Sequence, residues 1–185
     1  LSGKHNLYNI AAAICVAIEE NISIKNIAKG LNDFQGVGRR FELSKIYLAD
    51  QPHVLIDDYG HHPAEILSTI LATKEKFPRK KICMIFEPHR YTRTQQLFDD
   101  FVKVLSKLDF LLLLDIYPAS EKPIKGISSK KIAFQISKNH KNAHNLGNQD
   151  PIDWLQNNHQ DFSILITQGA GTISKLNNEI KKKWQ

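Results

Sequence analysis

The sequence predicts a doubly wound α/β fold with a mostly parallel sheet, preceded by a short helical segment. Two observations support this prediction. Short apolar runs of strand length alternate with segments whose apolar residues recur at the helical period, which is the pattern of successive β-α-β units. One run, 110–116, is apolar on both faces, as expected for a strand at the centre of a parallel sheet.

Two helices are expected before the sheet. Apolar residues recur at the helical period from Asn6 to about Glu20, and a second helix is expected from Ile24 to Leu31, with Ser23 as its N-cap. Two closely spaced glycines within 35–40 indicate a hinge. We place a domain boundary there, between residues 1–38 and 39–185. The buried stripe of the second helix is expected to contain Ile24, Ile27, Ala28 and Leu31.

The second part should contain four strands and five helices, with prolines at two of the helix starts. Residues 41–48 are expected to pair with the first strand as an antiparallel edge. The strands are expected around 54–56, 82–86, 110–116 and 163–167, and the helices at 63–77, 95–108, 129–137, from 151 onward, and at 172–184.

Length and composition permit one domain and a smaller piece. The chain has 185 residues, 42% of them hydrophobic and 24% charged, with a net charge of +6. No apolar run reaches the roughly 20 residues that a membrane span needs, and no signal peptide is recognisable. Cys15 and Cys83 are expected to be buried free thiols, which favours the cytoplasm. The chain starts in mid-pattern without methionine, so we expect it to be part of a longer protein.

Ionisable and glycine-rich segments follow four of the predicted strands. Because ligands of open α/β sheets bind beyond the carboxyl ends of the strands, these segments should form one site. They are 57–62, 87–93, 115–121 and 168–171.

Each group in these loops has a functional and a structural interpretation. Arg90 and Arg93 could bind a carboxylate or phosphate, or be solvated. The glycines of 169–171 could admit a ligand or make a tight turn. Five side chains could bind a metal ion: Asp57, Asp58, His61, His62 and His89. In the structural interpretation, Asp57 instead ends a strand and His62 caps the next helix.

In order along the chain, several strings resemble the Mur ligases. The most specific are Asp57-Asp58-Tyr59-Gly60-His61-His62-Pro63 and Pro88-His89-Arg90-Tyr91-Thr92-Arg93-Thr94. Three further strings also match: His5-Asn6-x-x-Asn9, Gly38-Arg39-Arg40-Phe41-Glu42 and Gln168-Gly169-Ala170-Gly171. Two positions depart from the family pattern: Glu87 stands where Gln is common, and Ser120 where Gly is common.

The resemblance implies a three-domain, ATP- and Mg²⁺-dependent enzyme that forms an amide bond through an acyl phosphate. Residues 1–38 would end the ATP-binding domain, and residues 39–185 would be the Rossmann-like C-terminal domain that binds the amino acid. The substrates would be ATP, UDP-N-acetylmuramate and L-alanine, with attachment of a murein tripeptide as the alternative within the family. The P-loop and most Mg²⁺ ligands would lie outside this chain, so the chain alone should be inactive.

The resemblance also implies residue roles. The L-alanine site would comprise Tyr59, His61, Arg90 and Arg93, of which His61 and the two arginines would be catalytic. ATP would be contacted by His5 and Asn9 at adenine, Arg40 at the phosphates and Asp58 at the ribose, and no metal ligand is assigned in this chain.

Two alternatives lie outside the family. One is a metal-dependent hydrolase built on the 57–62 loop. The other is a basic nucleic-acid-binding module, but the clusters 79–81 and 181–183 lack interleaved aromatic residues. We therefore expect neither nucleic acid nor a membrane as a partner.

Overall fold

The computed structural model describes residues 4–34, 38–138, 142–147 and 149–185. The chain divides into two compact units, Leu1–Gly38 and Arg39–Gln185.

The first unit holds α1 (Lys4–Glu19) and α2 (Ile24–Asp33), as the helical periodicity predicts. The backbone N–H of Asn26 donates to Ser23 Oγ over 3.4 Å, so Ser23 is the N-cap of α2. The expected buried stripe of α2 is wrong, because none of its residues is buried and Ile24 is 80% exposed. Cys15 is exposed as well, against expectation. Two helices that pack together bury only one side of each helix, so they cannot enclose a hydrophobic core.

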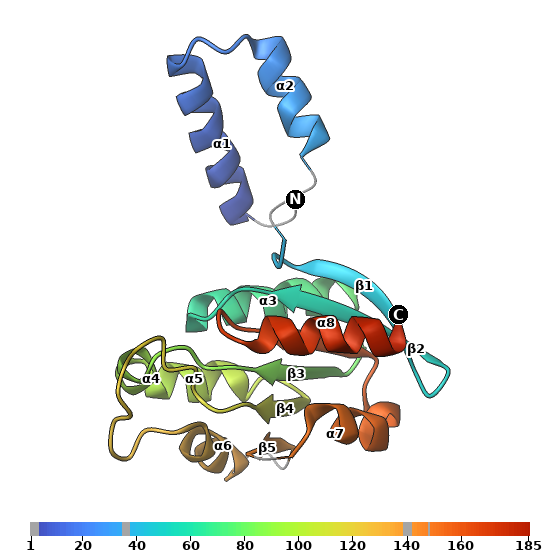
Figure 1. Ribbon diagram of the computed structural model, residues 1–185. Coiled ribbons are helices and arrows are strands. Elements are labelled where there is room, and N and C mark those ends of the chain that lie inside the picture. Colours follow the sequence, from blue (N-terminus) through green and yellow to red (C-terminus); the bar gives the residue numbers. More distant parts are fainter. Residues whose placement is uncertain (1–3, 35–37, 139–141, 148) are drawn as a thin grey trace. The chain divides into compact units, whose positions relative to one another are not determined.

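The second unit contains one sheet of six strands in the order β1-β2-β6-β3-β4-β5 (Figure 1). β1 is antiparallel to β2, and the other neighbours are parallel, which confirms the mostly parallel α/β class and the antiparallel edge. The strands are β1 (Glu42–Leu48), β2 (Gln51–Asp58), β3 (Ile82–Phe86), β4 (Phe110–Leu113), β5 (Ala143–Asn145) and β6 (Ile164–Gln168).

Helices cover both faces of the sheet, and each face has its own apolar core. One core is closed by α3 (Pro63–Lys76), α5 (Phe98–Leu105) and α6 (Ser129–Ser137). The other is closed by α7 (Pro151–Asn158) and α8 (Ile173–Trp184). A 3₁₀ turn, His159–Asp161, follows α7. Central strands are apolar on both faces because alternate side chains enter the two cores.

Three details differ from the sequence prediction. The helix expected over 95–108 is two helices, α4 (Tyr91–Gln96) and α5, because Leu97 leaves the helical region with φ −111° and ψ 23°. β4 ends at Leu113, earlier than expected, and Leu114 N–H then donates to Phe86 O over 3.0 Å. β5 was not predicted, since three residues are too few to show a period.

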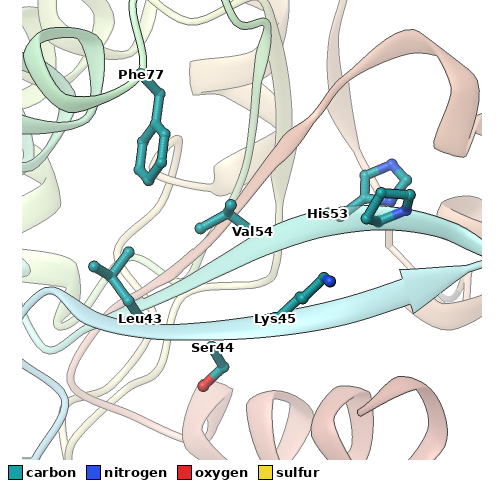
Figure 2. Close-up of a pocket in the computed structure, with 7 residues that line it drawn as sticks. Leu43, Ser44, Lys45, His53, Val54 and Phe77 are labelled. Atoms are coloured by element: carbon teal, nitrogen blue, oxygen red, sulfur yellow. The ribbon is translucent and has the colours of Figure 1, made fainter.

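A cavity of about 370 Å³ lies at the edge hairpin, away from the loops that follow the strands. Figure 2 shows Leu43, Val54 and Phe77 around it. Val54 begins the parallel pairing with β6, and Phe77 ends α3, so the cavity lies toward the amino edge of the sheet. Among the described residues, no helix combines the length and apolarity that a bilayer crossing demands.

Candidate functional site

The carboxyl ends of β2, β6, β3 and β4 lie side by side. Asp58 pairs with Gln168, Gln168 with Phe86, and Phe86 with Leu113. The loops that follow these strands therefore meet at one edge of the sheet, as the sequence predicts.

A continuous row of rings crosses this edge. The Tyr59 and His61 ring centroids lie 5.6 Å apart at 89°, and the His61 and His89 centroids lie 5.5 Å apart. His89 stacks on Tyr117 at 5.3 Å and 23°. The row joins three loops, so the fold brings the predicted Tyr59 and His61 together with His89.

Arg93 holds His89 within this row. Its Nη1 donates to His89 Nδ1 and to the His89 carbonyl, both over 3.2 Å. A guanidinium only donates, so Nδ1 accepts and the ring proton resides on Nε2. Burial lowers the pKa of His89, and the neighbouring charges of His61, Arg93 and Arg90 lower it further. His89 is therefore a neutral donor at Nε2.

Arg90 starts α4 with a left-handed backbone, φ 75°. Its N–H donates to Tyr117 O over 2.8 Å, and its half-exposed guanidinium lies 4.0 Å from Glu121 Oε1. Glu121 accepts from Thr92 N–H and from Thr92 Oγ1 over 3.0 and 2.7 Å, and these hydrogen bonds lower the pKa of Glu121. The guanidinium of Arg90 thus stays accessible beside the row of rings.

Asp58 links three segments of the unit. Its Oδ2 accepts from Phe41 N–H over 2.9 Å, and its Oδ1 accepts from Gly60 N–H and Gln168 Nε2 over 2.7 and 3.1 Å. Burial raises the pKa of Asp58, against the hydrogen bonds from Gly60 and Phe41. The structure thus gives Asp58 an internal role, and its contact with ribose stays a prediction.

Arg39 was not expected at the site, but the structure places it at this edge. Its Nε lies 3.3 and 3.2 Å from the two Asp57 carboxylate oxygens, and its Nη2 donates to Gly169 O over 2.7 Å. The neighbouring Arg40 is exposed, and none of the described residues forms a hydrogen bond or ion pair with its side chain. Two adjacent arginines look alike in sequence, so only the backbone path distinguishes them.

Glu87, which also had no assigned role, caps α8 from a different loop. Its Oε1 accepts from Thr172 Oγ1 over 2.6 Å and its Oε2 from Ile173 N–H over 3.0 Å. A Cβ on Gly171 would lie 2.5 Å from Glu87 Oε2 and 2.6 Å from Tyr117 Cγ. The structure supports the tight-turn interpretation of Gly171, because the protein itself occupies the space next to it.

Ser120, the other departure from the family pattern, has φ 71°. This left-handed region favours glycine, the residue that the resemblance leads us to expect there.

No group of three His, Cys, Asp or Glu side chains among the described residues is placed to hold a metal ion. Asp57 instead pairs with Arg39, and burial raises its pKa against that pairing. His62 caps α3, since its Nδ1 accepts from Ala64 N–H over 3.3 Å. The structural interpretation of the 57–62 loop accounts for both residues.

The predicted adenine contacts lie in the first unit. Asn9 is exposed on α1. His5 also belongs to α1, but its side chain falls outside the part that the structure describes.

Comparison with known proteins gives one family. A model of the family described as "Mur ligase, glutamate ligase domain" matches residues 39–171. A UDP-N-acetylmuramate–alanine ligase from Thermotoga maritima superposes with a TM-score of 0.68 and 23% identity, over 99% of this chain and 38% of that one. A murein peptide ligase from Psychrobacter arcticus gives 0.68 and 19%, over 98% and 37%.

A folylpolyglutamate synthase from Mycobacterium tuberculosis, complexed with ADP and AMPPCP, gives a TM-score of 0.65 and 14% identity, over 94% of this chain and 39% of that one. At these identities the likeness establishes the fold. The chain spans well under half the length of each of these three proteins.

Proposed function

This chain belongs to the Mur ligase family, and we propose that it is the amino-acid-binding domain of an ATP-dependent ligase that joins L-alanine to UDP-N-acetylmuramate. One observation carries the proposal. Arg90 is the N-cap residue of the short helix α4, and Arg93 lies within that helix, beside the ring row of Tyr59, His61 and His89 where the sheet's loops meet.

The chemistry needs a carboxylate-binding group of this kind. Transfer of the ATP γ-phosphoryl group to the muramate carboxylate gives ADP and an acyl phosphate. The alanine amine then attacks the acyl carbon, the C–N bond forms, the nitrogen gives up one proton to the solvent, and phosphate leaves with the C–O bonding electrons. Arg90 and Arg93 would bind the alanine carboxylate and so aim the amine. Their positive charge would also stabilise charge that develops on the departing phosphate.

The nucleotide would lie toward the start of the chain. In this proposal His5 and Asn9 contact adenine, Asp58 the ribose and Arg40 the phosphates. The exposure of Asn9 and Arg40 leaves them accessible for such contacts. Mg²⁺ would be held mainly by residues of the ATP-binding domain outside this chain, whose last helices would be α1 and α2.

Within the family, the murein tripeptide ligase is the second candidate, and the likeness to the Psychrobacter arcticus enzyme keeps it open. The 89–94 string favours L-alanine, because it resembles the alanine-adding members. Neither the metal-dependent hydrolase nor the nucleic-acid module gains support from a particular contact in the described residues.

The deciding experiment measures phosphate release by the full-length protein that contains this chain. ATP, Mg²⁺ and UDP-N-acetylmuramate are supplied with single amino acids or with murein tripeptide. Release that depends on L-alanine is expected. Release only with the tripeptide would transfer the assignment to the tripeptide ligase, and no release with either would refute the proposal.

The same assay tests the arginines. Arg90→Gln and Arg93→Gln should each lower kcat/KM for L-alanine roughly 10- to 100-fold, because each removes a charge-assisted hydrogen bond to the carboxylate. Arg79→Gln, an exposed arginine at the amino edge, is the matched control. Unchanged alanine kinetics in both variants would show that the carboxylate binds elsewhere.

A further inference from the structure

Arg39 contacts Tyr59 in two ways. The Arg39 carbonyl accepts the Tyr59 N–H over 2.7 Å, and the Arg39 Cζ lies 5.4 Å from the centroid of the Tyr59 ring. One residue therefore holds both the backbone and the ring of a residue in the proposed amino-acid site.

Burial does not hold the Tyr59 ring in place. The residue is 44% exposed, and its described ring contacts are the Arg39 guanidinium and the His61 ring. A guanidinium over an aromatic ring is attracted to the ring face, and this attraction opposes rotation of an exposed side chain.

The guanidinium is itself rigidly fixed. It binds both oxygens of Asp57 through Nε and the Gly169 carbonyl through Nη2. Asp57 is 4% exposed and also accepts from Thr167 Oγ1 over 3.4 Å. Thr167 Oγ1 in turn accepts from Asn177 Nδ2 over 2.6 Å, so a buried polar chain runs from α8 to Arg39.

We propose that Arg39 is a positioning residue for the amino-acid site: anchored on Asp57 and Gly169, it holds Tyr59 against His61. This inference rests on the proposed function only for the role of Tyr59 toward the amino acid. Arg39 itself need not contact the substrate. Lysine cannot replace it, because an ammonium group lacks the planar fork that joins Asp57, Gly169 and the ring.

The first test needs no enzymatic activity. The 185-residue chain is labelled with ¹³C in its five tyrosine rings, and the Tyr59 signal is identified by its loss in Tyr59→Phe. Arg39→Met should shift and narrow the Tyr59 signal, because the ring becomes mobile, and leave the other four unchanged. Arg79→Met is the matched control, since Arg79 is exposed and has φ 65°, close to the 60° of Arg39.

An unchanged Tyr59 signal in Arg39→Met would overturn the proposal. If Arg39→Met disturbs all five tyrosine signals, Arg39→Lys decides the matter, because it keeps a cation beside Asp57 and so protects the fold. A selective shift of Tyr59 in Arg39→Lys supports the proposal, and a Tyr59 signal like that of the unmutated chain refutes it.

The second test uses the kinetics of the full-length protein. Arg39→Met should raise KM for L-alanine roughly five- to tenfold and leave KM for ATP unchanged, since the lost contact is a cation–π interaction that orients one side chain of the amino-acid site. In a Tyr59→Leu background the same substitution should cause no further rise, because Arg39 acts through Tyr59.

A rise in KM for L-alanine of equal size in both backgrounds would overturn the positioning role. Absence of amino-acid-dependent phosphate release in the unmutated protein would instead refute the proposed function. The labelled-tyrosine measurement would then decide by itself whether Arg39 positions Tyr59.

Discussion

Replacing Glu87 should lower the free energy of unfolding of the second unit, because the carboxylate of Glu87 caps α8. Glu87 is 4% exposed, and its carboxylate accepts from Thr172 Oγ1 and from the first helical N–H of α8, that of Ile173. Glu87→Met removes both acceptors and leaves the N–H of a buried residue without a partner, which costs about 1–3 kcal/mol. Loss of negative charge at the helix N-terminus adds about 0.3–1 kcal/mol. The free energy of unfolding should therefore fall by about 1–4 kcal/mol.

Glu87→Gln should be much milder. The amide oxygen can accept from Ile173 N–H, and the amide nitrogen can donate to Thr172 Oγ1, so both hydrogen bonds survive without the charge. The expected loss is about 0.5–1.5 kcal/mol.

Urea unfolding of the chain, followed by the fluorescence of its two tryptophans, measures these changes. One of them, Trp184, lies in α8 itself. The midpoint should move while the m-value stays constant. Glu75→Met, an exposed substitution on α3, is the matched control, and it should change stability by less than about 0.5 kcal/mol. A Glu87→Met variant as stable as this control, or a Glu87→Gln variant as destabilised as Glu87→Met, would contradict the capping role of Glu87.

Two further predictions concern the same edge. Gly171→Ala would place a Cβ 2.5 Å from Glu87 Oε2 and 2.6 Å from Tyr117 Cγ. Its free energy of unfolding in urea should therefore be lower by about 1–3 kcal/mol. Gly30→Ala is the control and should show no such loss, because none of the described residues outside its own stretch of helix places a heavy atom within 4 Å of a Cβ at that position. The pKa of His89 is lowered in the folded state, first by burial, so the unfolded chain binds the proton first as pH falls below about 6.5. The stability due to neutral His89 is therefore present above that pH and is lost as pH falls toward the pKa of the folded state. Between about pH 7.5 and 5.5, the free energy of unfolding measured in urea should decline less in His89→Asn than in the unmutated chain. An equal decline in both proteins would contradict this role of His89.

Local chemistry allowed much of this fold to be predicted from the sequence alone. Ser23, Pro63 and Asp150 each begin or cap a helix at the predicted position, because capping requires only a few neighbouring residues. The strands β2, β3 and β6 follow from short apolar runs, and the parallel arrangement follows from their alternation with helices. The four loops at the carboxyl edge follow from that arrangement, so the sequence also located the candidate site.

Contacts between distant residues had to be found in the tertiary structure. No feature of β6 in the sequence reveals that it lies between β2 and β3. Glu87 caps a helix whose first residue, Ile173, is 86 positions away, and Arg39 meets a carbonyl, that of Gly169, 130 positions away. Such partners have no fixed spacing, so no periodicity or short motif encodes them. The sequence determined which chemical groups are available and at which edge of the sheet they gather, whereas folding decided which of them hold the structure and which remain accessible to a substrate.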